Sequence, residues 1–355
     1  LAARLEVLFG RGPDQAWTDE EFGALALEVF EVQFTSNVVY RGFCEGRGVT
    51  SASVDDWREI PAVPTRAFKH LDLLSASPAE ATFQTSGTTS DLGLRGRHLI
   101  PRVSLYEASL LPCFSAHLMP EGKSLRFISL IPDPEDARGS SLSYMVGAAA
   151  RRFASRTDYV VDGSGVVDHG VLAAALADAQ AAAEAVLMLG TAFAFMNVME
   201  HSDVCLGPLP QGSRIMETGG FKGRGRAVPR DELYEAMSRA TSVPVERIVN
   251  EYGMTELLSQ LYEPVLTGES LGCGHIAPPW LQVRAVDPTT LRELPEGEAG
   301  LLTFFDLANA GSVAHILTED FGAVRDGRVF LEGRAAGAEP RGCSRAMDEL
   351  MAVAR

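Results

Sequence analysis

The sequence predicts an α/β fold with parallel-rich sheets and helices, joined to a small antiparallel β subdomain. The short apolar runs Leu125–Ile131 and Val186–Leu189 are typical of buried strands, and each is followed, after a turn, by a helical pattern. Alternation of this kind favours parallel β-α-β units. From about Leu281 the segments become short and β-rich, with turns such as Asp326-Gly327 between them, which indicates an antiparallel sheet.

The remaining elements follow from local patterns. Residues 1–46 form a helical lead-in, because Asp19-Glu20-Glu21 suits the first turn of a helix and apolar residues recur after it. Ala81–Gln84 is a short β-favouring run that leads into a polar loop. Helices are further expected at Leu142–Phe153, Val171–Ala185, Ala192–His201 and Arg230–Ala240, and strands at Ile248–Tyr252, Leu281–Val286, Leu301–Phe305, Val313–Leu317 and Arg328–Leu331.

Composition excludes several classes of protein. The chain has 355 residues, of which 46% are hydrophobic and 22% charged, an ordinary globular mixture. The formal charge of −16 would repel a phosphate backbone, so no nucleic acid partner is expected. The longest apolar stretch, Ala181–Met196, is interrupted by Glu184, so no membrane span is expected. Five widely spaced cysteines and no visible secretory signal favour the cytoplasm.

The first motif with chemical content is a cluster of small and hydroxyl residues after the Ala81–Gln84 run. Glycine allows a close backbone approach to an anion, and hydroxyl and N–H donors suit phosphate. An ordinary polar turn is the alternative. The cluster consists of Thr85, Ser86, Gly87, Thr88, Thr89 and Ser90.

Two further segments carry candidate residues. In the segment Glu251–Glu256, Tyr252 could stack on a nucleobase, Thr255 could donate to a phosphate oxygen and Glu256 could hold a magnesium ion. In Leu317–Asp320, the carboxylate of Asp320 suits two vicinal ribose hydroxyls. A strand end and a solvated acidic turn are the respective alternatives.

In this order, the three segments resemble the phosphate loop, the YGxTE segment and the TGD segment of the adenylate-forming superfamily, which includes acyl-CoA synthetases and phenylacetate-CoA ligases. Met216–Phe221 is similar to the adenine-site loop of that superfamily, which implies nucleotide contacts for Gly219 and Gly220. Gly333-Arg334 resembles its hinge-region Gly-Arg pair. The resemblance adds Gly253 and Arg334 to the expected ATP-binding residues.

Within that superfamily the chain most resembles the acyl-protein synthetases of the LuxE family, through Glu217–Gly223 and Asn250–Leu257. The resemblance implies an adenylate-forming core at 1–275, a β-rich subdomain at 276–334 and a short tail at 335–355, with the usual C-terminal domain largely absent. It also implies that ATP and Mg²⁺ activate a carboxylic acid, expected to be a fatty acid, as acyl-AMP. The acyl group would pass to a cysteine near the C-terminus, for which Cys343 is the candidate, and then to an acyl-reductase or acyl-carrier partner.

The chain departs from the superfamily at two basic positions. Its phosphate loop continues with Ser90-Asp91-Leu92-Gly93 and has no Pro-Lys, and the lysine that full-length relatives hold in the C-terminal domain is missing. Lys222 is the candidate replacement, with Arg95 and Arg97 as further cations. Two other functions therefore stay open: a ligase that passes the acyl group to coenzyme A or a carrier protein, and an inactive scaffold or nucleotide-binding relative.

Overall fold

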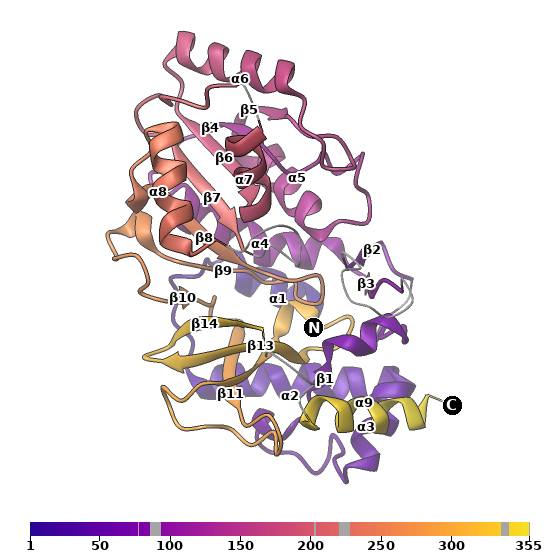
Figure 1. Ribbon diagram of the computed structural model, residues 1–355. Coiled ribbons are helices and arrows are strands. Elements are labelled where there is room, and N and C mark those ends of the chain that lie inside the picture. The colour runs from indigo at the N-terminus through magenta and orange to yellow at the C-terminus, as the bar shows by residue number, and fades with distance from the viewer. Residues whose placement is uncertain (77, 86–93, 202–203, 220–227, 335–340, 355) are drawn as a thin grey trace. The chain divides into compact units, whose positions relative to one another are not determined.

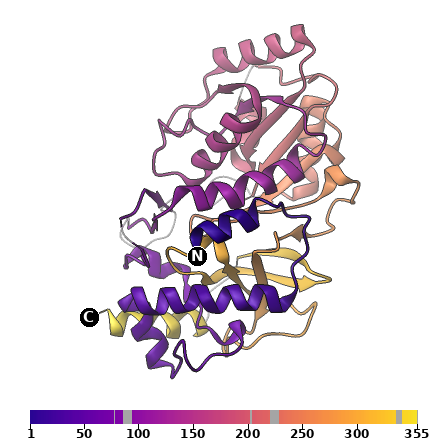
Figure 2. The same ribbon diagram turned by 180° about the vertical axis from the view of Figure 1, so that it is seen from behind.

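The computed structural model describes residues 1–76, 78–85, 94–201, 204–219, 228–334 and 341–354. The predicted ligands Ser86, Gly87, Thr88, Thr89, Ser90, Gly220 and Lys222 lie outside these residues. The described chain divides into two compact units, whose elements Figures 1 and 2 show from opposite sides. Unit 1 comprises Leu1–Pro112, Met254–Gln260 and Gly274–Arg355, and unit 2 comprises Cys113–Gly253 and Leu261–Cys273.

Unit 2 is built on a parallel sheet. Its strands are ordered β5-β4-β6-β7-β8-β9, and all neighbours pair in parallel except β8 and β9. Every residue of β4 and β7 is buried, as expected for a sheet covered on both faces. The strands are β4 (Leu125–Ser129), β5 (Ala154–Tyr159), β6 (Val186–Thr191), β7 (Arg214–Thr218), β8 (Ile248–Tyr252) and β9 (Leu261–Tyr262).

Helices flank this sheet in Figure 1, and the apolar sides of α6, α7 and α8 form one core cluster with the strands. These helices are α5 (Ser141–Phe153), α6 (His169–Ala182), α7 (Ala192–His201) and α8 (Arg230–Thr241). The expected α/β alternation is therefore confirmed, and Ala183 ends α6 in a left-handed conformation two residues before the predicted end. Helix α4 (Val103–Leu118) begins in unit 1 and ends in unit 2, and the unit boundary follows Pro112 inside it.

Unit 1 contains the predicted antiparallel sheet, in the order β11-β12-β13-β14-β10, and the short β1 pairs with β13 in parallel. A separate hairpin joins β2 and β3. The strands are β1 (Val63–Pro64), β2 (Ala81–Gln84), β3 (Arg97–Ile100), β10 (His275–Ile276), β11 (Leu281–Val286), β12 (Gly300–Asp306), β13 (His315–Arg325) and β14 (Arg328–Arg334).

The helices of unit 1 confirm the predicted lead-in and add one at the C-terminal end. Thr18 and Glu21 form a capping box at the start of α2, which explains why the acidic run opens a helix. Figure 2 shows the C-terminal helix α9 beside α3. The helices are α1 (Ala2–Phe9), α2 (Asp19–Ser36), α3 (Val38–Gly46) and α9 (Arg341–Val353).

The compact units follow other boundaries than the expected ones at 275 and 334, because residues 1–112 group with the β-rich segment. The boundaries at 275 and 334 follow from the resemblance to the acyl-protein synthetases, and they stay a prediction.

Candidate active site

The base of the predicted phosphate loop is closed by Thr85. The β2–β3 pairing ends at Gln84 and Arg97, and the Thr85 N–H then donates to the Gly96 carbonyl at 2.9 Å. The Gly96 N–H donates back to Thr85 Oγ1 at 2.8 Å. Arg97, a candidate cation, pairs with Asp72 at 2.8 Å on the exposed side of the hairpin. Thr85 therefore anchors the loop through both its backbone and its hydroxyl group.

Thr255 and Glu256 lie in an irregular segment of unit 1 whose backbone is held by side chains from elsewhere in the unit. The Thr255 carbonyl lies 2.8 Å from His98 Nδ1, and the Glu256 carbonyl accepts from Asn309 Nδ2 at 2.8 Å. His98 and Asn309 are both fully buried, while Glu256 is 8% exposed. These two hydrogen bonds fix the backbone on both sides of Glu256.

The same segment is held further along by Asp306. This fully buried carboxylate accepts from the Leu258 N–H at 3.0 Å and from Ser259 Oγ at 2.7 Å. Burial raises the pKa of Asp306 to about 6, against the lowering effect of these hydrogen bonds. Ser259 Oγ lies 2.9 Å from Ser109 Oγ, to which Trp280 Nε1 also donates at 2.8 Å. The polar groups named here are thus paired within the core.

Asp320 lies inside β13 and not in a turn. Its register partner on β14 is Arg334, and Arg334 Nε lies 3.4 Å from Asp320 Oδ1. The side chain of Asp320 is 19% exposed and that of Arg334 is 65% exposed, so solvent screens the pair. Two predicted nucleotide-binding residues are therefore adjacent in unit 1, and the Thr318 hydroxyl accepts from the Asp320 N–H at 3.1 Å.

Cys343 lies in the first turn of α9 and is 2% exposed. It belongs to an apolar cluster with Val286, Leu301 and Leu317. Its thiol lies 3.8 Å from the Thr318 carbonyl, two residues before Asp320 on β13. The predicted acyl acceptor therefore packs in a buried place against the strand that carries the predicted ribose ligand.

Helix α9 is held by polar contacts at two places, one on each side of this thiol. The Gly342 N–H donates to the Pro288 carbonyl at 2.9 Å, and a Cβ atom at Gly342 would lie 2.8 Å from that oxygen. Glu349 pairs with Arg47, the residue directly after α3, at 2.7 Å and with Arg345 at 3.8 Å. Arg345, two residues after Cys343, is thus directed to a carboxylate of its own helix.

In unit 2 the adenine-loop segment begins at the end of β7, where Glu217 is buried. Tyr234 OH donates to Glu217 Oε2 at 3.2 Å, and Asn250 Nδ2 donates to the same oxygen at 2.5 Å. Burial raises the pKa of Glu217 above its usual value. The side chain thereby connects the ends of β7 and β8 with helix α8.

Arg230 and Glu263 form an adjacent bidentate ion pair in which the Glu263 side chain is 1% exposed. Arg230 Nη1 donates to Glu263 Oε1 at 2.8 Å, Nη2 donates to Oε2, and Nη2 also donates to Tyr234 OH at 3.2 Å. The Glu263 N–H donates to the Asn250 carbonyl at 3.0 Å. Local sequence patterns contain no signal for this network, because its members are individually ordinary surface residue types.

The predicted ligands Gly219, Tyr252 and Gly253 lie at the ends of β7 and β8. Gly219 is exposed, and a Cβ atom built on it would meet no described atom within 4 Å. Tyr252 is half-buried and pairs with Leu261 of β9. Tyr252 offers an aromatic face of the kind that stacks on a nucleobase.

The donor set in the described residues also fits one mode of Mg²⁺ binding. No group of three or more His, Cys, Asp or Glu side chains that could hold a metal occurs among them. Mg²⁺ commonly takes only one or two protein carboxylates and completes its shell with water and substrate phosphates. The single carboxylate of Glu256 matches that mode.

Across the same part of the chain, no helix has the length and hydropathy that a bilayer crossing requires.

Solved structures with a similar fold are adenylate-forming ligases. 2-Hydroxyisobutyryl-CoA ligase in complex with 2-HIB-AMP and CoA aligns with a TM-score of 0.65 at 15% identity, over 89% of this chain and 69% of the ligase. ATP-bound MatB from Rhodopseudomonas palustris aligns with a TM-score of 0.53 at 15% identity. That alignment covers 74% of this chain but spans only 48% of MatB. These likenesses confirm the adenylate-forming type of fold.

Relatives are found by sequence as well. A long-chain-fatty-acid–luciferin-component ligase of Vibrio harveyi is 25% identical over 341 residues, covering 92% of this chain and 86% of the relative. The ligase of the same name from Aliivibrio fischeri is 24% identical over 326 residues, covering 88% and 82%. The family model of the acyl-protein synthetase LuxE matches residues 15–352. The chain therefore belongs to the acyl-protein synthetase (LuxE) family of ATP-dependent, adenylate-forming ligases.

Proposed function

We propose that this chain uses ATP to convert a fatty acid into acyl-AMP and then carries the acyl group as a thioester on Cys343. The observation that carries the second step is the position of that thiol, 3.8 Å from the Thr318 carbonyl and two residues before Asp320 on β13. The first step is supported by family membership and by the backbone hydrogen bonds that fix Thr255 and Glu256.

In the first step, a carboxylate oxygen of the acid attacks the α-phosphorus of ATP. The bond from that phosphorus to the β-phosphate oxygen breaks, and pyrophosphate leaves. Thr255 would donate to a phosphate oxygen, and Asp320 would accept hydrogen bonds from the ribose hydroxyls. Lys222, Gly220 and the loop Ser86–Ser90 would complete the phosphate and adenine contacts. Mg²⁺ held by Glu256 would supply charge neutralisation on the phosphates.

In the second step, the Cys343 thiolate attacks the acyl carbon, a carbon–sulfur bond forms and AMP leaves. The thiol proton passes to solvent. Because the thiol is 2% exposed, α9 has to leave its docked position before Cys343 can reach acyl-AMP. An acyl-reductase or acyl-carrier partner would then take the acyl group from the exposed thioester.

The burial of Cys343 also favours a second candidate function, in which α9 stays docked. In that case the acyl group passes directly to coenzyme A or to the thiol of a carrier protein.

The five cysteines form no disulfide, which supports the cytoplasm as the compartment for either function.

The test is intact-mass analysis after incubation with ATP, Mg²⁺ and a panel of fatty acids of different lengths. Cys343→Ser is compared with Cys205→Ser, because Cys205 is an exposed thiol elsewhere in the chain. We expect acylation of the wild type and of Cys205→Ser but not of Cys343→Ser. Pyrophosphate release without labelling of any protein would instead establish an external acceptor. Absence of both reactions with every acid would overturn the proposed function.

A further inference from the structure

His98 links the base of the phosphate loop to the segment that carries Thr255 and Glu256. It lies on β3, two residues after Gly96, and faces Phe83 of β2 in the hairpin register. The two hydrogen bonds between Thr85 and Gly96 lie two residues before His98 along β3. Its imidazole ring is fully buried and contacts the edge of the Phe68 ring at 5.2 Å between centroids.

The hydrogen bonds of His98 define its tautomer. Nδ1 lies 2.8 Å from the Thr255 carbonyl, which can only accept, so Nδ1 carries the hydrogen atom. Nε2 then accepts from Ser312 Oγ at 2.7 Å. Burial lowers the pKa of His98 to about 4, so the ring is neutral near pH 7 and stays in this tautomer.

The two peptide planes that flank Glu256 are both held by buried side chains. The Thr255 carbonyl belongs to the plane before Glu256 and is held by His98, and the Glu256 carbonyl belongs to the plane after it and is held by Asn309. Because each peptide unit is planar, fixing both carbonyls fixes the backbone angles of Glu256 and the direction in which its side chain leaves the chain. The position of the carboxylate is thus set from β3 and from the turn after β12.

We propose that His98 is a positioning residue that fixes the direction of the Glu256 side chain through the Thr255 carbonyl. The role rests on the proposed function, because Glu256 is the expected Mg²⁺ ligand of the adenylation step. His98 itself is fully buried and acts through the Thr255 carbonyl. Loss of its Nδ1 donor would release the peptide plane before Glu256 and displace the carboxylate, and small displacements of this kind reduce turnover strongly.

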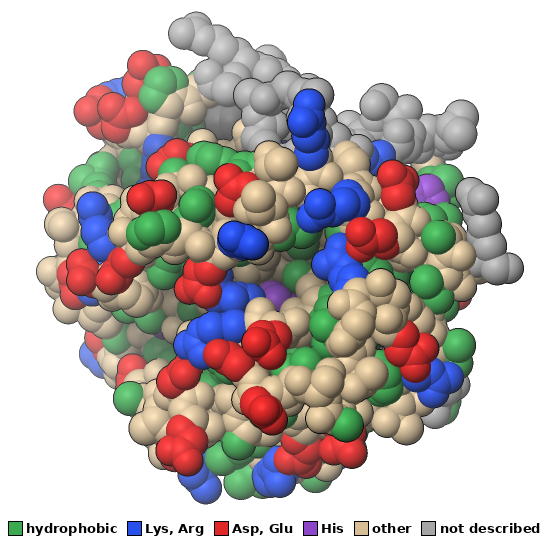
Figure 3. Space-filling view, turned by 90° about the horizontal axis from the view of Figure 1, so that it is seen from below, with side chains coloured by type: hydrophobic (Ala, Val, Ile, Leu, Met, Phe, Trp, Pro, Cys, Tyr) green, Lys and Arg blue, Asp and Glu red, His purple; other side chains and the backbone are tan. Residues whose placement is uncertain are grey.

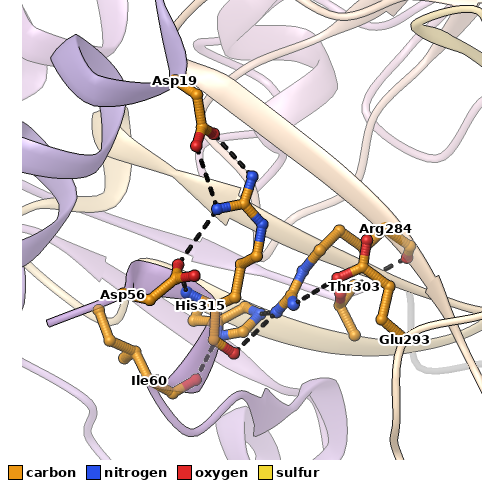
Figure 4. A network of polar contacts seen from close by, with 8 residues as sticks. Asp19, Asp56, Ile60, Arg284, Glu293, Thr303 and His315 are labelled. Carbon is orange, nitrogen blue, oxygen red and sulfur yellow. Dashed lines mark hydrogen bonds and ion pairs between the residues drawn. The ribbon is translucent and has the colours of Figure 1, made fainter. Parts of the chain in front are cut away.

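A second buried histidine of unit 1, His315, provides a matched control. It is 3% exposed, its Nδ1 lies 2.6 Å from the Ile60 carbonyl, and its Nε2 lies 3.4 Å from Arg284 Nη2. Figure 4 shows these contacts together with Glu293. Like His98, it donates from a buried ring to a backbone carbonyl, but its acceptor belongs to no predicted ATP-binding segment.

The test compares His98→Asn with His98→Gln, which both keep a polar side chain. The amide nitrogen of asparagine reaches about the place of Nδ1, whereas that of glutamine reaches about the place of Nε2. We expect His98→Asn to retain acid-dependent pyrophosphate release within about fivefold, and His98→Gln to lose about 100-fold in kcat. The Mg²⁺ concentration for half-maximal rate should rise in His98→Gln, while the KM for the acid stays unchanged. His315→Asn should stay within about twofold of the wild type, because it touches no site residue.

Binding of MgATP, measured by calorimetry on the same variants, gives a second readout, and affinity should fall in His98→Gln only. Equal kinetics and equal binding in the two His98 variants would overturn the positioning role while leaving the proposed function intact. So would a loss of activity in His315→Asn as large as that in His98→Gln, because a general effect of losing a buried histidine would then suffice. A wild type that neither binds MgATP nor releases pyrophosphate would overturn the proposed function and the role of His98 with it.

Discussion

The surroundings of His98 and of His315 are chemically similar but hold different parts of unit 1. Both rings are buried, both donate from Nδ1 to a backbone carbonyl, and both have a strongly lowered pKa. Around His315, Arg284 pairs with Glu293 at 3.0 Å and Arg58 pairs with Asp19 at 2.7 Å, as Figure 4 shows. Around His98, the neighbours are instead uncharged side chains and the backbone of the Thr255–Glu256 segment.

The difference shows that a perturbed pKa alone does not mark a functional site, since structural networks produce it as well. The face of the molecule in Figure 3 carries intermixed basic and acidic side chains around a hollow that contains a histidine. Judged by charge alone, this hollow would be taken for a functional site. What separates the two histidines is the segment whose backbone each one holds. Four predictions use this separation.

The largest effect is expected for Glu256→Gln. Removal of the carboxylate should lower the rate of acid-dependent pyrophosphate release about 100-fold to 1,000-fold, because charge on the phosphates loses its stabilisation. Glu293→Gln, in the His315 surroundings, serves as the control and should retain the wild-type rate. Steady-state pyrophosphate assays on both variants measure this. Equal rates in the two variants would remove Glu256 from the catalytic residues.

The second prediction is that the free energy of unfolding depends on pH through both histidines in the same way. Burial lowers the pKa of His98 to about 4 and that of His315 to about 3, whereas an unfolded histidine titrates near 6.5. The unfolded state therefore binds protons that the folded state excludes, and the free energy of unfolding should fall as the pH drops from 6.5 towards 4. Each histidine contributes about 3 kcal/mol or more to this loss at its acidic limit.

Asp306 acts in the opposite direction over part of that range. Its folded pKa of about 6 exceeds its ordinary value of 3.8, so its burial costs stability at neutral pH and that cost disappears as the pH falls through 6. Denaturant unfolding between pH 7 and pH 4 should show the net loss in the wild type and a flatter curve in both His98→Asn and His315→Asn. Unchanged curves in either variant would contradict the assignment for that histidine.

A smaller effect is expected for Asp320→Asn, which keeps the shape of the side chain and removes its charge. The KM for ATP should rise about tenfold, because hydrogen bonds from ribose hydroxyls to a carboxylate are stronger than those to an amide. Asp56→Asn removes a comparable carboxylate from the His315 surroundings and should leave this KM unchanged. Kinetics at varied ATP concentration distinguish the two. An unchanged KM in Asp320→Asn would exclude ribose binding by this residue.

The smallest effect is expected for Ser312→Ala. This change removes the donor to His98 Nε2 and leaves the Nδ1 bond to Thr255 in place. The free energy of unfolding should fall by about 1 kcal/mol, and turnover should stay within about threefold. Thermal unfolding and pyrophosphate assays measure both. A loss of turnover as large as that of His98→Gln would show that the tautomer of His98 depends on Ser312 more than on the Thr255 carbonyl.

Most of the fold is readable from the sequence because its elements carry strong local patterns. The predicted strand Leu281–Val286 matches β11, and the predicted helix Arg230–Ala240 differs from α8 by one residue. Helix α4 was not predicted, since Pro112 inside it removes a backbone donor and argues locally against a helix. Strand β5 was also missed, because it follows α5 without any turn residues between them.

The candidate site is readable only in part. Thr255 and Glu256 belong to a contiguous motif, so the sequence alone is enough to propose them as site residues. Their buried partners do not, because His98 lies 157 positions from Thr255 and Asn309 lies 53 positions from Glu256. The burial of Cys343 is likewise a tertiary effect, created by the docking of α9 on β13. Local sequence therefore predicts the reacting groups, and the folded chain supplies the groups that position them.

The most direct test of the central claim, adenylation of a carboxylic acid, is the exchange of labelled pyrophosphate into ATP, which requires reversible formation of acyl-AMP. We expect exchange that depends on both a fatty acid and Mg²⁺ and that persists in Cys343→Ser, because the thiol acts only in the second step. Absence of exchange with every acid tested, at saturating ATP and Mg²⁺ and in a folded protein, would contradict it.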